Sequence, residues 1–171
     1  LARAENYVYT FRGHREVVAR LMAVALDHDI EPDYVRGIIR KHGLLPPALP
    51  VTGRWPWPVK IFTLGEFRVE VDGRPLVFGR KAPKKPLLLL KAIIAFGGRN
   101  IPEQKLIDVL WPDEDGDSAR EAFAVSLHRL RKLLVHADVV ELSEGLVSLD
   151  AAKCWADLWA LGNYFQEEDD A

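Results

Sequence analysis

This chain of 171 residues has few of the residues on which disulfide-rich, metal-binding and membrane proteins depend. Its single cysteine, Cys154, excludes an intramolecular disulfide and provides no thiolate cluster for zinc. The five histidines show no close metal-ligand spacing with it. No apolar run approaches the roughly 18 residues of a membrane-spanning helix, and the N-terminus lacks the basic-then-apolar pattern of a signal peptide. We therefore expect a cytoplasmic protein without a bound metal and without a place in the membrane.

Sequence signatures of catalysis are also missing. The phosphate-binding pattern Gly-x-x-x-x-Gly-Lys-Ser/Thr does not occur, and no Ser/His/Asp or paired-carboxylate arrangement stands out. We expect a protein that is not an enzyme, with no catalytic residues and no cofactor. Residue 1 is Leu, which suggests a fragment of a longer protein. A nucleotide, if one is used, would then bind in another part.

The net charge of −2 does not by itself favour nucleic acid, but the charges are segregated along the chain. Between residues 79 and 105, seven cations stand against one acid, Glu103. The acids concentrate in two clusters, at 113–117 and at 167–170. A basic surface is therefore compatible with an acidic protein.

Apolar spacing, prolines and glycines divide the chain into four segments. Residues 1–44 are typical of a helical pair that is too small to bury both faces alone, like the end of a helical repeat array. Five of the eleven prolines fall in residues 45–58, which predicts a stiff extended linker. Residues 59–150 form the main predicted domain, and residues 151–171 a C-terminal helix with an acidic tail.

The main domain begins with strands and continues with helices. Short alternating segments between residues 59 and 78, with a two-residue turn at 72–73, predict an antiparallel sheet of three strands. A strongly apolar helix is expected at 87–96, opened by Pro86. A second helix is expected between Pro102 and Pro112, since proline is tolerated in the first turn of a helix but not further inside.

A third helix is expected between Ser118 and Leu134, where Ser118 and Glu121 would form a capping box. Its apolar residues share one face because they recur at i, i+4, i+7 and i+11: Phe123, Leu127, Leu130 and Leu134. The opposite face is largely polar and cationic. An ordinary solvated surface helix has the same pattern, so the neighbouring elements decide between the two interpretations. A hairpin expected at 139–149 would be a wing.

The order of these elements and several short sequences within them resemble the OmpR/PhoB-type winged helix-turn-helix of the Streptomyces antibiotic regulatory protein (SARP) group. The matching sequences are Leu64–Val69 with Asp72-Gly73, Leu110-Trp111-Pro112 and Leu127–Leu134. Stretches around Glu31-Pro32 and Cys154-Trp155 resemble the C-terminal region of large MalT-like regulators, which carry an ATPase and a helical repeat array upstream. The resemblance implies an α+β fold in which a helical pair precedes an N-terminal antiparallel sheet, three helices and a C-terminal hairpin wing.

The resemblance also implies a function, that of a sequence-specific double-stranded DNA-binding domain of a bacterial transcription regulator. The third helix would enter the major groove, where Arg129 would read a base and Val125 and Ala122 could touch thymine methyl groups. Phosphate contacts would come from further side chains, namely Ser126, His128, Arg131, Lys132, Lys84 and Lys85. Glu121 could accept a hydrogen bond from cytosine, but capping is its expected role.

Two acidic features have less direct interpretations. The loop at Asp113, Glu114, Asp115 and Asp117 corresponds to the segment that in relatives touches RNA polymerase, and a solvated turn explains it equally well. The predicted wing tip carries Glu144, which would repel phosphates. Members of the resembled family often bind direct repeats, so the resemblance is compatible with a dimer or with a tandem arrangement on DNA. The alternative function is a winged-helix protein-interaction module within a larger signalling ATPase.

Overall fold

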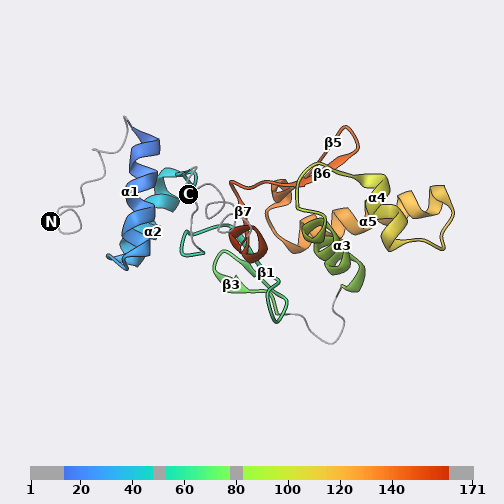
Figure 1. Ribbon diagram of the computed structural model, residues 1–171, viewed down its shortest axis with the longest axis horizontal. Helices are drawn as coiled ribbons and strands as arrows, with labels where there is room; N and C mark the ends of the chain where they lie inside the picture. The colour runs from blue at the N-terminus through green and yellow to red at the C-terminus, as the bar shows by residue number, and fades with distance from the viewer. Residues whose placement is uncertain (1–13, 48–52, 78–82, 162–171) are drawn as a thin grey trace. The chain divides into compact units, whose positions relative to one another are not determined.

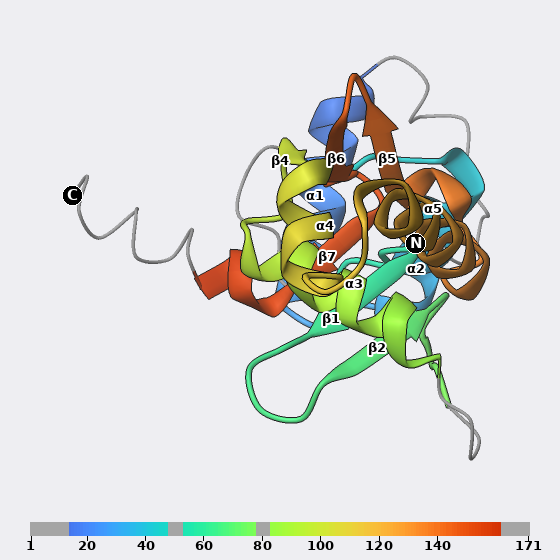
Figure 2. The same cartoon turned by 90° about the vertical axis from the view of Figure 1, so that its right-hand side faces the viewer.

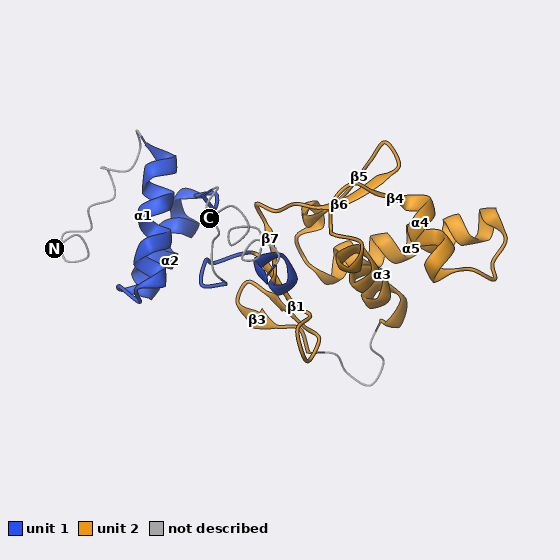
Figure 3. Ribbon diagram, viewed as in Figure 1, with its two compact units in different colours: residues 1–57, 157–171 blue, residues 58–156 orange. Residues whose placement is uncertain are grey.

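The computed structural model describes residues 14–47, 53–77 and 83–161 (Figure 1). The chain divides into two compact units, one made of residues 1–57 with 157–171 and the other of residues 58–156 (Figure 3). In the parts of the chain that are described, no helix is long and apolar enough to cross a membrane.

The first unit contains the predicted helical pair, α1 (Arg15–Asp27) and α2 (Pro32–His42). Each helix buries one apolar stripe, centred on Met22 in α1 and on Ile38 in α2. Gly43 ends α2 in the left-handed conformation, with φ of 54°. The next amide, of Leu44, donates to the carbonyl of Ile39 at 3.0 Å, which satisfies a carbonyl that the helix end leaves free.

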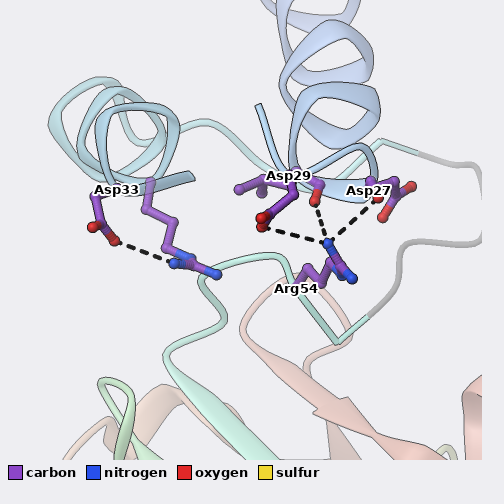
Figure 4. Close-up of polar contacts among 6 residues, drawn as sticks. Asp27, Asp29, Asp33 and Arg54 are labelled. Carbon is purple, nitrogen blue, oxygen red and sulfur yellow. Dashed lines mark hydrogen bonds and ion pairs between the residues drawn. The ribbon is translucent and has the colours of Figure 1, made fainter. Parts of the chain in front are cut away.

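Arg54, from the predicted linker, is anchored at the C-terminal end of α1 (Figure 4). Its Nη1 donates to the carbonyl oxygens of Leu26 at 3.1 Å and Asp27 at 3.4 Å, and lies 3.7 Å from Oδ1 of Asp29. The last carbonyls of a helix have no partner within the helix and carry partial negative charge, so a guanidinium is favourable there.

The predicted linker, residues 45–58, is thus not extended throughout. Residues 53–57 belong to the first compact unit, and Trp55 and Trp57 are both buried. Indole rings bury a large area, so this segment is packed rather than a solvated connector. Residues 48–52 of the predicted linker lie outside the described part.

The second unit begins with a sheet of β1 (Val59–Phe62), β2 (Arg68–Val71), β3 (Arg74–Pro75) and β7 (Cys154–Ala156), in the order β3-β2-β1-β7. The first three strands are antiparallel, as predicted, but β7 pairs in parallel with β1. The three predicted antiparallel strands are confirmed, and β7 is a fourth strand that was not predicted. Residues 154–156, expected within a C-terminal helical segment, form a strand, and residues 157–161 are helical.

Three helices cover the interior of this unit: α3 (Lys84–Ala95), α4 (Glu103–Leu110) and α5 (Gly116–Leu133). The predicted apolar stripe of α5 is buried, and its Phe123 ring meets Trp111 edge to face with centroids 6.4 Å apart. Helix α3 begins at Lys84 rather than after Pro86, because proline fits the first turn, where an amide hydrogen is not needed. Lys84 and Lys85 therefore form the first turn of α3 instead of preceding it.

The N-terminus of α5 is capped by Asp115 and not by the predicted Ser118–Glu121 box. The Asp115 carboxylate accepts from the Ser118 amide at 3.0 Å and from the Ser118 hydroxyl at 3.0 Å. These two hydrogen bonds lower the pKa of Asp115 below its ordinary value. An aspartate caps a helix as well as a serine does, and this one stands three residues earlier, so the helix begins at Gly116.

The hairpin predicted as a wing is formed by β5 (Val140–Ser143) and β6 (Leu146–Leu149), after the short 3₁₀ helix η2 (Ala137–Val139). Its turn residues, Glu144 and Gly145, have φ of 51° and 74°, as a two-residue hairpin turn requires. Strand β4 (Ile101–Pro102) pairs with β6, and the Glu103 amide donates to the Gly145 carbonyl at 2.8 Å. The hairpin extends beyond the three helices (Figures 1 and 2). The predicted fold class, an α+β winged helix-turn-helix, is confirmed.

Candidate nucleic-acid interface

Helix α5 presents an exposed face opposite its buried stripe. On this face lie Val125, which is 41% exposed, and the exposed side chains of His128, Arg129 and Lys132. Within the described ranges, none of these three polar side chains has a hydrogen bond or ion pair. The charges of Arg129 and Lys132 are therefore available to an anionic partner, since no carboxylate of the described residues pairs with them.

The three predicted base-contacting residues share one line along α5. Ala122, Val125 and Arg129 stand at i, i+3 and i+7, so they lie one above another on the helix. Val125 and Arg129 are exposed, and Ala122 is half-buried. An arginine beside two short apolar side chains is a suitable set for reading a guanine next to thymine methyl groups.

Ser126, a predicted phosphate contact, is buried, with 5% of its surface exposed. It stands three residues after Phe123 and four before Leu130, which places it beside the buried stripe rather than on the outer face. A side chain that is 5% exposed offers a phosphate little surface. The prediction for Ser126 is corrected accordingly.

Arg131, another predicted phosphate contact, is tied to the wing. Its Nε donates to the carbonyl oxygen of Val140 in β5 at 2.9 Å, and the side chain is half-buried. This hydrogen bond leaves both terminal nitrogens of the guanidinium for other partners. Arg131 is thus held in place while it retains its charge and four of its five donor hydrogens.

A shallow groove runs between α5 and the hairpin, and it was not predicted. Among the residues that line it are Arg120, Ala124, His128, Arg131, Leu142 and Glu103. The first four recur on one flank of α5 at i, i+4, i+8 and i+11, a spacing visible in the sequence. Leu142 and Glu103 come close to α5 because β4 pairs with β6. This pairing joins segments distant in the chain, so a local sequence pattern does not predict it.

Lys84 and Lys85, the predicted phosphate contacts outside α5, differ from each other. Lys85 Nζ donates to the carbonyl oxygen of Leu110 at 2.7 Å and lies 4.9 Å from the centroid of the Trp111 ring. It therefore stabilises the C-terminal end of α4, where a cation is favourable. Lys84 is exposed and has no partner in the described part of the chain. Of these two lysines, Lys84 has its whole ammonium group available to a phosphate, while Lys85 uses one of its three donors within the fold.

The acidic loop between α4 and α5 also divides by role. Asp115 serves as the cap of α5. Asp113, Glu114 and Asp117 are exposed. Among the described residues, their carboxylates have no hydrogen bond or ion pair with another side chain. The hairpin strands and their turn, residues 140–149, add two exposed acids, Glu141 and Glu144, and contain no lysine or arginine.

Comparison with known proteins adds little to this geometry. No protein-family model and no curated protein sequence matches the chain. A solved structure of Mycobacterium tuberculosis EmbR, in complex with a low-affinity phosphopeptide, is similar with a TM-score of 0.44 and 22% sequence identity. The similarity covers 57% of this chain and 27% of that one, so this chain spans about a quarter of the EmbR structure. The function has to be argued from the residues of this chain.

Proposed function

We propose that this chain is a sequence-specific double-stranded DNA-binding domain of a bacterial transcription regulator, a binding module that acts in the cytoplasm and not an enzyme. One observation carries the proposal. Helix α5 combines a fully buried stripe with an exposed face whose cations have no partner in the described residues. The major groove of B-DNA, about 12 Å wide, admits such a helix with its charged face toward the bases and phosphates.

One residue of α5 would contact a base and so recognise sequence, and several others would contact phosphates. Arg129 would bind the O6 and N7 atoms of a guanine, with Val125 and Ala122 against neighbouring thymine methyl groups. His128 and Lys132 would bind phosphates, which position the helix without reading sequence. Lys84 would add a phosphate contact from the first turn of α3, whereas Ser126 is buried and Lys85 is bonded to the Leu110 carbonyl.

The test is selection of bound sequences from a random duplex pool by the whole chain at moderate salt, followed by two variants. Arg129→Ala should weaken binding of the selected duplex by about 1–3 kcal/mol and relax one base position. Lys132→Ala should weaken all duplexes similarly and reduce the salt slope by about one. If Arg129→Ala binds as tightly and as selectively as the parent, Arg129 is not the reader. If no duplex is selected at any salt concentration, DNA binding is the wrong function.

We further propose that the acidic loop contacts RNA polymerase and so activates transcription. The exposed carboxylates of Asp113, Glu114 and Asp117 are a suitable surface for a basic partner. A pull-down of polymerase subunits should lose signal when all three are changed to their amides, while duplex binding is retained. Polymerase binding by a chain that selects no duplex would instead favour a protein-interaction module. Direct repeats among the selected sequences would indicate tandem binding.

A further inference from the structure

We propose that an exposed apolar stripe of α1 binds the same stripe of a second copy of this chain, with the two helices antiparallel. The stripe consists of Val17, Leu21 and Val24, which are 64%, 57% and 50% exposed. These residues recur at i, i+4 and i+7, so they lie on one side of the helix. The inference concerns the first unit alone and does not depend on DNA binding.

Helix α1 is apolar on two sides. Its buried stripe includes Val18, Met22 and Leu26. At 100° per residue, the exposed stripe is centred roughly 140° away from the buried one around the helix. A helix on the surface of a globular protein normally has one apolar side, and a helix with two is packed on both. The exposed stripe of α1 is therefore suited to packing against a further helix.

The spacing of the exposed stripe is that of a seam between two helices. Its residues alternate in steps of three and four, like the a and d positions of a coiled coil, and the exposed His14 and His28 continue the pattern at either end. The apolar part is only three residues long, so it buries much less than the roughly 800 Å² per partner of a stable interface. We therefore expect a dimer in equilibrium with the monomer, with a Kd of roughly 0.1–1 mM.

The end of the helical pair where α1 passes into α2 is acidic. Four carboxylates follow one another there in alternate positions: Asp27, Asp29, Glu31 and Asp33. Figure 4 shows three of them, with the two arginines that lie nearby. Arg54 is 3.7 Å from Asp29, and Arg36 is 3.3 Å from Asp33. Two cations against four acids leave this end net negative.

The opposite end of the helical pair is basic. Arg15, at the start of α1, donates through Nη2 to the carbonyl oxygens of His42 at 2.9 Å and Gly43 at 2.7 Å, at the end of α2. Arg40 and Lys41, in the last turn of α2, are exposed and have no hydrogen bond or ion pair with any described residue. This end is therefore net positive.

The opposite charges of the two ends select the antiparallel arrangement. When Val17 of one copy lies opposite Val24 of the other, a two-fold axis passes close to Leu21, and Arg15 lies near the level of the second copy's Asp27. Each basic end is then beside an acidic end. Parallel helices would instead place like charges together, which is unfavourable. Because exposed charges are screened over about 10 Å at 0.1 M salt, the dimer should weaken as salt rises.

The experiment is sedimentation equilibrium of the whole chain without DNA, at protein concentrations from about 0.01 to 1 mM and at low and high salt. The dimer fraction should rise with protein concentration and fall with salt. Leu21→Glu and Val17→Glu should each abolish the dimer. Val17 is in the first turn of α1, where a carboxylate stabilises a helix, so Val17→Glu removes the apolar contact without weakening the fold.

Two variants with matched controls separate the seam from its charges. Reversal of both free cations, Arg40→Glu with Lys41→Glu, should weaken the dimer several-fold at low salt and little at high salt. Arg74→Glu, at an exposed position of β3, controls for the change in net charge. Val109→Glu, at a 55% exposed position of α4, controls for placing an acid at an exposed valine. Neither control should change the dimer fraction by more than a small amount.

The orientation of the helices is tested by disulfide formation with a copper oxidant. A mixture of Val17→Cys and Val24→Cys should form a cross-linked dimer, whereas either variant alone should not. The native Cys154 is buried and should not contribute. Cross-linking by each variant alone would mean that the helices are parallel, which contradicts the proposal.

Circular dichroism melts first establish that each variant folds. A chain that stays monomeric up to the highest concentration overturns the proposal, because something other than a second copy must then cover the stripe. A dimer that persists in Leu21→Glu and Val17→Glu also overturns it, because another surface then holds the copies together. Duplex binding is measured separately, so the failure of this proposal and the failure of the proposed function are distinguishable.

Discussion

Val135, directly after α5, should be replaceable by glycine with a gain in stability. Its φ of 65° lies in the left-handed region, although it is β-branched, and 67% of its surface is exposed. Left-handed backbone costs an L-residue roughly 1–2 kcal/mol, and the upper figure suits a β-branched side chain. Glycine removes that cost but loses about 0.5–1 kcal/mol to the entropy of the unfolded chain. It also gives up about 0.5 kcal/mol from the third of the side chain that is covered. We expect a net gain of about 0.5 kcal/mol in the free energy of unfolding.

Thermal and urea unfolding of Val135→Gly measure this gain, which corresponds to a rise in Tm of about 2–4 °C for a unit of this size. The matched control is Val109→Gly, at an exposed position inside α4 with 55% of its surface accessible. Glycine there should lower stability by about 1 kcal/mol, because it adds backbone freedom and also gives up the covered part of the side chain. A loss at Val135 equal to that at Val109 would mean that Val135 is not in a left-handed conformation and that α5 does not end at Leu133.

Three further changes test local roles. Asp115→Ala should lower the Tm at pH 7 whereas Asp115→Asn should largely preserve it. The capping bonds from Ser118 lower the pKa of Asp115, so the charged cap stabilises the fold above the ordinary value of 3.8. That contribution is lost as pH falls through the lowered pKa, and the deficit of the Ala variant should shrink there. Lys85→Gln should cost about 0.5–1 kcal/mol through the Leu110 carbonyl and leave the salt slope of DNA binding unchanged. Burial, with the Asp150 charge second, raises the pKa of the Cys154 thiol, so iodoacetamide should label it only in denaturant.

The sequence predicted the elements of the winged helix because their patterns are local. The apolar stripe of α5 and the hairpin around residues 143–145 each require only a few neighbouring residues, and both are present in the structure. The turn itself is Glu144-Gly145, one residue shorter than predicted, because Ser143 belongs to β5. Strand β7 was missed because three residues show no reliable period, and its partner Val59 lies far away in the chain. Element boundaries moved where two good caps competed, as at Asp115 and Ser118.

The sequence predicted the residues on the outer face of α5, but not the contacts that residues beside this face make with other elements. Arg129 and Val125 follow from the helical wheel alone, and both are exposed. Ser126 was assigned a phosphate contact from its position in the resembled family, although the helical wheel places it beside the residues that pack inward. The bond of Lys85 to α4 and that of Arg131 to β5 join segments distant in sequence, so no spacing rule could have separated these two cations from the free ones.

A net charge of −2 is compatible with binding a polyanion because, in the second unit, some acids are paired with a cation of the protein while some cations have no partner among the described residues. Asp138 and Asp150 share Lys153, at 3.0 and 2.7 Å, so these acids contribute little field outside the protein. Arg129 and Lys132 have no such partner in the described residues. Since exposed charges act over about 10 Å at 0.1 M salt, DNA near α5 would respond to these free cations more than to the total charge of the chain. Among the described residues, the exposed acids of the loop before α5 and of the hairpin would repel a duplex that approached from those sides: Asp113, Glu114, Asp117, Glu141 and Glu144.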